Sequence, residues 1–319
     1  MGKKGPRRGS VAFWHRCRAP GLVPRVRCWP IAEKGLLGFA GYKVGMEHVL
    51  MVDDSDSPFK GQEVTKSVTF VEVPPAFGYA IVLYENTIHG VKALCQACAK
   101  NASKDARRRL TVAKKEGDLS ALEKLLGRAS AVRMLFITTP RSIGLKKTPE
   151  VYEVAFGGDV KAQFESAKAF FGKEVHASDV LKEGDYVDVI AVTKGKGWQG
   201  VVKRFGVALN PHKATGARRH GGTLGAETQA KVFYTIPRAG QMGFHRRTDL
   251  NKRILKVGSV ADAKPLAPKS GFTSYGEING DFIVLEGSIP GPAKRFVRLR
   301  KALRPRLQAR KAEVKEFVA

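Results

Sequence analysis

Residues 186–202, YVDVIAVTKGKGWQGVV, join a strand-like apolar run to the glycine motif G-K-G-W-Q-G at 195–200. The spacing G-x-G-x-x-G matches the phosphate-binding turn of dinucleotide enzymes. With the two valines that follow, it also matches the glycine-rich loop of protein kinases. A third interpretation is that the glycines let the main chain come close to a polyanion without any enzyme chemistry. The residues around the motif decide between the three.

The sequence after the motif argues against both enzyme interpretations. A dinucleotide fold needs a long helix directly after the third glycine and an acid about 20 residues further on. Here Gly206 and Pro211 leave no room for such a helix, and the next acid is Glu227, beyond a second glycine-rich loop. A kinase needs the motifs V-A-I-K, H-R-D and D-F-G, and the sequence contains none of them.

The third interpretation gives each residue type in the motif a task. Glycines allow the backbone to approach phosphates, Lys196 and Lys203 neutralise them, and Trp198 stacks on an unpaired base. The alternative for Trp198 is burial in the core, because tryptophan is mostly buried in folded proteins.

The composition favours a polyanionic partner. The 319 residues include 56 Lys and Arg against 29 Asp and Glu, a formal charge of +27, whereas solubility needs a net charge of roughly 2–8. Nucleic acid is the first candidate, an anionic membrane surface the second, and an unusually basic enzyme the third. No apolar run reaches the roughly 18 residues that span a bilayer, so a cytoplasmic location is expected.

Three windows contain no acid at all: residues 1–32, 189–226 and 287–312. A solvated surface normally mixes charges of both signs, so these windows indicate contact with an anion. The first is rich in glycine and proline, with aromatic residues interleaved. It cannot bury enough surface to fold alone, and we expect it to become ordered only on its partner.

Strand and helix signals outline a β region, an α/β region and a second β region. Helices are predicted at 92–104, at 120–127 with a capping box from Ser120 to Glu123, and from the N-cap Asp159 onward. The apolar face of that last helix contains Val160, Phe164, Ala167 and Phe171. Strands are predicted within 68–73, 80–85, 132–140, 186–192, 253–260 and 281–289.

The cysteines do not indicate a metal site. Cys95 and Cys98 form one C-x-x-C, but Cys17 and Cys28 do not form a second. Because 92–104 is predicted as helical, the first pair is interpreted as small core residues, and no metal is expected.

Four stretches together resemble the large-subunit ribosomal protein L-three family, in its archaeal type. They are PRRGSVAFWHRCRA (6–19), GKGWQGVVKRFG (195–206), RAGQMGFHRRT (238–248) and YGEINGDFIVLEGSIPGPAKRFVRLRKALRP (275–305). The resemblance implies a mainly β fold with an α/β insertion: a six-stranded β-barrel like those of translation factors, interrupted by an inserted α/β domain, plus an extended basic N-terminal arm and internal loop. The implied parts are the arm (1–35), the first part of the barrel (36–90), the insertion (91–180), the second part of the barrel (181–290, with a long basic loop at 194–250) and a basic C-terminal segment (291–319).

The resemblance also implies a function. Such a protein is a structural constituent of the large ribosomal subunit in the cytoplasm, binds large-subunit ribosomal RNA early in assembly and extends a loop toward the peptidyl transferase centre. It supplies no catalytic group and needs no cofactor, metal, membrane or small-molecule substrate. Its other partners are neighbouring large-subunit proteins, among them protein L-fourteen. The alternatives are an RNA-modifying enzyme and another basic nucleic-acid-binding protein, such as a DNA-compacting one.

Residue types and the matched motifs together select the RNA-binding candidates. They are Lys3, Lys4, Arg7, Arg8, Trp14, His15, Arg16, Arg18, Lys194, Lys196, Trp198, Gln199, Lys203, Arg204, His212, Lys213, Arg218, Arg219, His220, Gln241, His245, Arg246, Arg247, Lys294 and Arg295.

Overall fold

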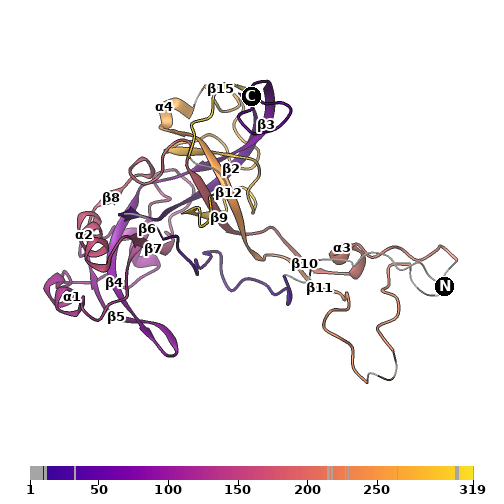
Figure 1. Cartoon of the computed structure of the whole chain (residues 1–319), viewed down its shortest axis with the longest axis horizontal. Coiled ribbons are helices and arrows are strands. Elements are labelled where there is room, and N and C mark those ends of the chain that lie inside the picture. Colours follow the sequence, from indigo (N-terminus) through magenta and orange to yellow (C-terminus); the bar gives the residue numbers. More distant parts are fainter. Residues whose placement is uncertain are drawn as a thin grey trace. The chain divides into compact units, whose positions relative to one another are not determined.

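The computed structural model describes residues 10, 13–31, 34–213, 216, 218–226, 228, 230–263, 265–305 and 309–318 (Figure 1). The chain divides into two compact units. We call residues 1–20 and 192–246 the loop unit, and residues 21–191 and 247–319 the sheet unit. The candidates Lys3, Lys4, Arg7 and Arg8 lie outside the described residues.

The first sheet of the sheet unit has seven strands, and the strand pairs with known register are antiparallel. Six of the strands pair one after another, and the first of these six also pairs with the sixth, so they form a near-closed ring. The seventh strand pairs with the outer part of the sixth. In path order they are β14 (Phe296–Lys301), β9 (Tyr186–Val192), β12 (Arg246–Gly258), β13 (Phe282–Glu286), β3 (Glu63–Glu72) and β2 (Gly38–Val52), and the seventh is β15 (Val314–Val318).

Burial on both faces explains the composition of the ring strands. In β9, the six residues after Tyr186 are all buried, and all of them except Asp188 are apolar. Strands buried on both sides read as continuous apolar runs, which is why this segment carries no alternating pattern. In β2, a Cβ on Gly45 would lie 2.4 Å from the Phe272 ring, so a side chain there would displace that ring.

A second antiparallel sheet carries the helices. Its order is β1 (Gly35–Leu36), β7 (Val151–Gly157), β6 (Ala131–Thr138), β4 (Ala76–Thr87) and β5 (Gly90–Cys98), with β8 (Glu174–Val175) beside β4. Helix α2 (Val160–Phe170) lies beside β6 and β7 and buries Phe164 and Ala167 (Figure 1). The remaining helices of the unit are α1 (Leu119–Leu125), α4 (Val260–Ala263) and the 3-10 turns η1 (Lys104–Arg108) and η2 (Ala177–Asp179).

All six strand predictions are confirmed, and the helix after Asp159 is too, but two local predictions are wrong. Residues 92–98 lie in β5 and not in a helix, because the strand gains a full set of hydrogen-bonded partners on β4. Helix α1 is capped by Asp118, whose carboxylate accepts from the Ser120 N–H at 2.9 Å, so Ser120 is not the N-cap. Strand β4, within the predicted 36–90 part, lies in the second sheet.

The strand β5 separates the two cysteines of the C-x-x-C. Successive side chains of a strand point to opposite faces, so residues three apart lie on different sides. Cys95 packs against the main core cluster, whereas Cys98 packs against a smaller one that contains Tyr79 and Ile137. The two thiols therefore do not share one metal site.

Part of the N-terminal arm packs on the sheet unit. Arg298 of β14 is buried, donates to the carbonyls of Pro24 (3.2 Å) and Glu153, and lies over the Trp29 ring. Burial lowers its pKa to about 10, so it stays charged at neutral pH. Arg300, two residues along, pairs with Asp188 and donates to the Cys28 carbonyl at 2.6 Å. The prediction that the arm packs only on a partner is therefore wrong for these residues.

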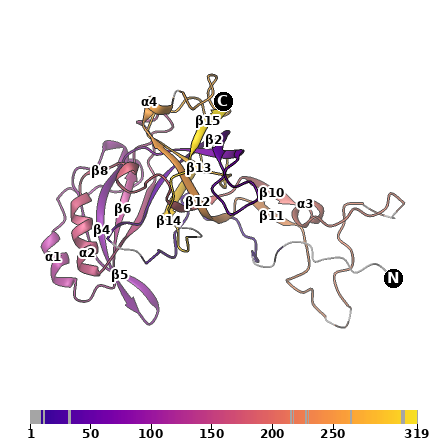
Figure 2. The same cartoon turned by 45° about the horizontal axis from the view of Figure 1, so that its top comes forward.

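The loop unit has little regular structure. Its described residues include the strands β10 (Gly195–Gln199) and β11 (Gly240–Gly243) and the short helix α3 (Val201–Phe205), which lie side by side in both views (Figures 1 and 2). The described residues contain no helix that is both long and apolar enough to span a membrane.

Candidate nucleic-acid interface

The glycine motif forms one strand of a two-stranded antiparallel sheet, whose strands are separated in the sequence by residues 200–239. We call this pair of strands the glycine hairpin. Strand β10 pairs with β11 so that Gly195 lies opposite Gly243 and Trp198 opposite Gln241, with an irregularity between them. Gly197 sits at that irregularity with a φ of +65°, a left-handed conformation that favours glycine. A Cβ there would meet no atom within 4 Å, so the glycine serves the backbone conformation and leaves the surface open.

Gly243 has a different reason to be glycine. Its φ is +72°, and a Cβ would lie 2.0 Å from the Lys194 carbonyl oxygen of the opposite strand. The two strands can approach this closely only because no side chain stands between them. The hairpin that carries Lys196 and Trp198 therefore depends on glycines in both of its strands.

The helix after the motif is too short for a dinucleotide site. Helix α3 has five residues and ends at Gly206, whose φ of +68° is the left-handed conformation of a helix C-terminus. Val201 and Phe205 are buried, whereas Lys203 is exposed. The structure thus agrees with the sequence argument that Gly206 and Pro211 prevent a long helix here.

Arg204 connects α3 to the strand β11. Its Nε donates to the Gln241 carbonyl at 3.0 Å and its Nη1 to the Arg238 carbonyl at 2.9 Å. Burial, and then the nearby Arg16 charge, lower the pKa of this guanidinium. Gly240 accommodates it, because a Cβ there would lie 2.9 Å from Arg204 Nη1. This predicted RNA contact thus has several of its donors engaged within the protein.

Residues 14–17 of the arm pack on the same elements. The Trp14 ring meets Phe205 edge to face at 5.1 Å, and the Arg16 guanidinium lies over Phe205 at 4.4 Å. Arg16 also donates to the Arg204 carbonyl at 3.3 Å. The prediction that the arm acquires order only from a partner is therefore also wrong for this part of the arm.

The structure gathers most of the candidates that it describes in the loop unit. Eleven are exposed there: His15, Arg18, Lys194, Lys196, Trp198, Lys203, His212, Lys213, Arg218, Arg219 and His220. Six are partly buried: Trp14, Arg16, Gln199, Arg204, Gln241 and Arg246. Three belong to the sheet unit instead: Arg247, Lys294 and Arg295.

Among the described candidates, His245 differs from the rest in being buried. Its side chain is buried, and its Nδ1 donates to the Cys17 carbonyl at 2.8 Å. Its backbone N–H donates to the Thr193 hydroxyl at 3.1 Å. These contacts hold residue 17 of the arm against the end of β11, so this histidine has a structural role within the loop unit.

Four residues that the candidate set omitted lie beside it. Phe205, Phe233, Tyr234 and Arg238 line a cavity together with Trp14, His15 and Arg16. The sequence signal of Phe233, Tyr234 and Arg238 was the run V-F-Y-T-I-P-R at 232–238, an aromatic segment within a basic loop, and that of Phe205 was its place directly after Lys203 and Arg204. Aromatic rings interleaved with cations are typical of surfaces that bind single-stranded nucleic acid.

Charge separates the two units sharply. The loop unit contains sixteen Lys and Arg residues against one acid, Glu227, whereas the sheet unit contains forty against twenty-eight. None of the ion pairs among the described residues includes Lys194, Lys196, Lys203, Arg218 or Arg219 of the loop unit. The uncompensated charge of the protein is thus concentrated on a segment with exposed cations and aromatics.

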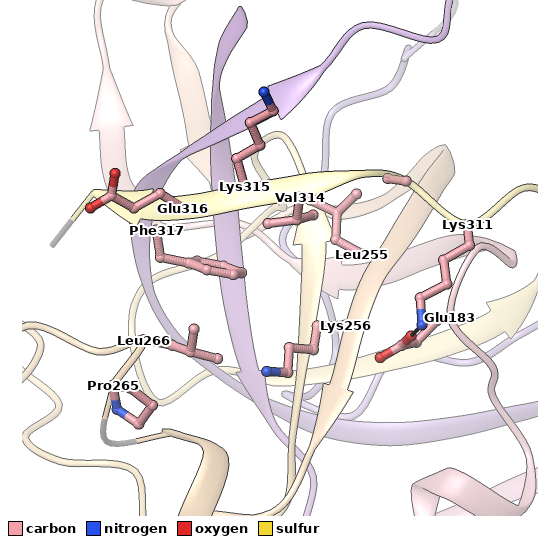
Figure 3. A pocket seen from close by; sticks show the side chains of 11 residues that line it. Glu183, Leu255, Lys256, Pro265, Leu266, Lys311, Val314, Lys315, Glu316 and Phe317 are labelled. Atoms are coloured by element: carbon pink, nitrogen blue, oxygen red, sulfur yellow. Dashed lines mark ion pairs between the residues drawn. The ribbon is translucent and has the colours of Figure 1, made fainter. Parts of the chain in front are cut away.

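A larger cavity in the sheet unit has a different character. It measures about 510 Å³, and its walls include Leu255, Leu266 and Phe317 together with charges of both signs (Figure 3). Lys311 forms an ion pair with Glu183 across its edge at 2.7 Å. Mixed and partly neutralised charges make it a poorer site for a polyanion than the loop unit.

Comparison with known proteins identifies the family. The family model described as Ribosomal protein L3 matches residues 1–318. Large ribosomal subunit protein uL3 of Methanothermobacter thermautotrophicus is 46% identical over 309 residues, which cover 94% of this chain and 92% of that protein. Protein uL3 of Pyrobaculum calidifontis is 48% identical over 314 residues, with coverages of 94% and 92%. Both relatives are archaeal. The chain belongs to the ribosomal protein L3 family.

Proposed function

We propose that this protein is a structural component of the large ribosomal subunit, in the cytoplasmic ribosome, and that it binds large-subunit RNA through its loop unit. The observation that carries the proposal is the concentration of cations in the loop unit, with Lys194, Lys196 and Lys203 exposed on and beside the glycine hairpin. Phosphates attract such cations, and release of condensed counterions drives binding. The relatives are named as large ribosomal subunit proteins, and the family is one of ribosomal proteins and not of enzymes.

The finer features belong to the same proposal. The near-closed six-strand ring is proposed to be a barrel like those of translation factors, and the second sheet with its helices to be a domain inserted into it. The loop unit is proposed to extend toward the peptidyl transferase centre, and the protein to join the RNA early in assembly. Protein L-fourteen is proposed as a neighbour. The glycine-rich hairpin and the basic loop beyond it support an extended RNA-threading segment.

Cosedimentation with large subunits tests the proposal. The tagged chain should remain with the large subunit after a high-salt wash, because its contacts are made during assembly. A loop triple, Lys194, Lys196 and Lys203 each changed to Gln, should reduce incorporation. A sheet triple, with Lys92, Lys114 and Lys115 each changed to Gln, removes the same charge from exposed positions in the sheet unit and should not.

Two outcomes would contradict the proposal. Recovery of the unmodified chain only in the free-protein fraction would show that the protein is not a component of the large subunit. Equal loss of incorporation in the loop triple and the sheet triple would show that net charge matters and its position does not, which would remove the loop unit as the RNA-binding part.

A further inference from the structure

The aromatic cavity of the loop unit has no role in the proposed function as stated. It measures about 250 Å³ and is enclosed by three segments: residues 14–16 of the arm, the end of α3, and residues 232–238. Sites for drug-sized ligands typically measure roughly 300–1,000 Å³. The cavity is smaller than these and suits a single planar group.

The walls of the cavity are ring faces and edges. Trp14 and Phe205 meet at 5.1 Å on one side, and His15 and Tyr234 at 5.6 Å on the other. Tyr234 is 62% exposed, which is unusual for a large aromatic side chain in a packed cluster. Exposed rings of this kind offer stacking surfaces to any of the bases, since every base has a π-face.

The charge of the lining favours an anionic ligand. His15, Arg16, Arg204 and Arg238 contribute to it, and no acid does. Arg204 is engaged with two carbonyls and Arg16 lies over Phe205, whereas Arg238 is exposed. None of the ion pairs formed within the described parts of the chain includes Arg238 or His15. Both side chains are exposed, so both can contact a phosphate from the solvent side.

From these three observations we propose that the cavity receives one unpaired nucleotide of the RNA. Its base stacks on the exposed ring of Tyr234, and its phosphate lies near Arg238. This inference rests on the proposed function, because it assumes that RNA lies against the loop unit. A free mononucleotide offers the same chemistry, and the test below separates the two sources.

Binding of the full chain to in vitro transcribed large-subunit RNA tests the proposal. Tyr234→Ala should weaken binding by about 5- to 100-fold, the loss expected for one stacked base. Tyr234→Phe keeps the ring and should bind like the unmodified chain. Leu209→Ala removes an exposed apolar side chain elsewhere in the same unit and should have no such effect. Ultraviolet cross-linking should attach a nucleotide to residues 232–238, and Tyr234→Ala should abolish that cross-link.

The outcomes separate this inference from the proposed function. Suppose that the unmodified chain binds the RNA with a steep salt dependence, that Tyr234→Ala binds equally well, and that no cross-link forms at 232–238. The proposal that the cavity receives a nucleotide is then wrong, and the proposed function stands. If the unmodified chain fails to bind the RNA, both are wrong. If AMP raises the melting temperature as much in the unmodified chain as the RNA does, and Tyr234→Ala removes that shift, the cavity is a free-nucleotide site and the proposal is overturned.

Discussion

Trp198 and Phe205 stand seven residues apart on the same segment and have opposite environments. Trp198 is 76% exposed on β10, whereas Phe205 is buried against Trp14 and Arg16. Trp198→Ala should cost about 1–3 kcal/mol of RNA affinity through loss of stacking and leave the melting temperature unchanged. Phe205→Ala should instead cost about 3–5 kcal/mol of folding stability. Melting curves and RNA titrations on both variants check this. A Trp198→Ala variant that melts early and binds normally would assign the indole to the core.

Glu72 should make folding stability depend on pH. The side chain is fully buried, accepts from the Tyr275 hydroxyl, and accepts from the Asn279 N–H at 2.7 Å. Burial raises the pKa of Glu72 above the usual carboxyl value. At a pH between the unfolded and the folded pKa, the carboxyl group is therefore protonated in the folded state and ionised in the unfolded state. Stability from this group is therefore fully present below the unfolded pKa of about 4.5 and is lost as pH rises through the folded pKa.

The variant Glu72→Gln tests this sign. A neutral amide has no proton to release, so the free energy of unfolding of the variant should fall less than that of the unmodified chain as the pH rises from about 4.5 toward neutrality. Urea unfolding at several pH values measures the difference. Parallel pH profiles would show that Glu72 stays ionised throughout, with its hydrogen bonds outweighing its burial.

At the scale of elements, the sequence was most informative where burial is continuous. The apolar runs that became β9 and β13 were recognisable because nearly every residue in them is buried. Strand β5 was mistaken for a helix because its residues are mostly small or polar, and only pairing with β4 decides their conformation. The cap of α1 was misplaced by two residues, since Asp118 and Ser120 are both good capping residues and local sequence does not rank them.

The anchoring of the arm on β14 is a contact that no local pattern could predict. Arg298 looked like one cation among many in the third acid-free window, yet its guanidinium is buried under Trp29 and bonded to Pro24. Arg298→Met keeps the length and removes these donors, each of which contributes about 1.5–3 kcal/mol. Residues 21–31 should then open more often, and trypsin should cleave after Arg25 and Arg27 about tenfold faster or more.

A matched variant controls for the loss of charge. Lys294→Met removes an exposed cation four residues away and should leave the cleavage rate unchanged. The melting temperature of Lys294→Met should stay near that of the unmodified chain, whereas Arg298→Met should melt earlier, because the carbonyls of Pro24 and Glu153 lose their donor. If Arg298→Met is cleaved no faster, the segment is held by its buried apolar residues, such as Val26, and not by the arginine.

For the whole molecule, the position of the acid-free windows could be predicted from the sequence. Which residues of these windows come together in the folded protein could not be predicted. The acid-free windows follow directly from composition, and two of them supply the loop unit. The third window instead places Arg298 and Arg300 inside the sheet unit, where they face carbonyls and Asp188. A run of cations does not reveal which of them are buried, because that depends on contacts between segments far apart in the chain. The aromatic cavity, built from residues 14–16 and 232–238, was missed for the same reason.

The salt dependence of RNA binding tests the division of charge between the two units. A protein that neutralises about ten phosphates gives a plot of log K against log salt with a slope of about −7 to −9. The loop triple removes three exposed cations from the hairpin and α3, so its slope should be shallower by about 2–3. The sheet triple carries the same net charge but loses cations that do not meet phosphates, so its slope should equal that of the unmodified chain. Filter binding between 50 and 400 mM salt, on the order of one decade, resolves such differences. Equal slopes for the two triples would mean that the RNA responds to the net charge of the protein, and the loop unit would then have no special part in binding.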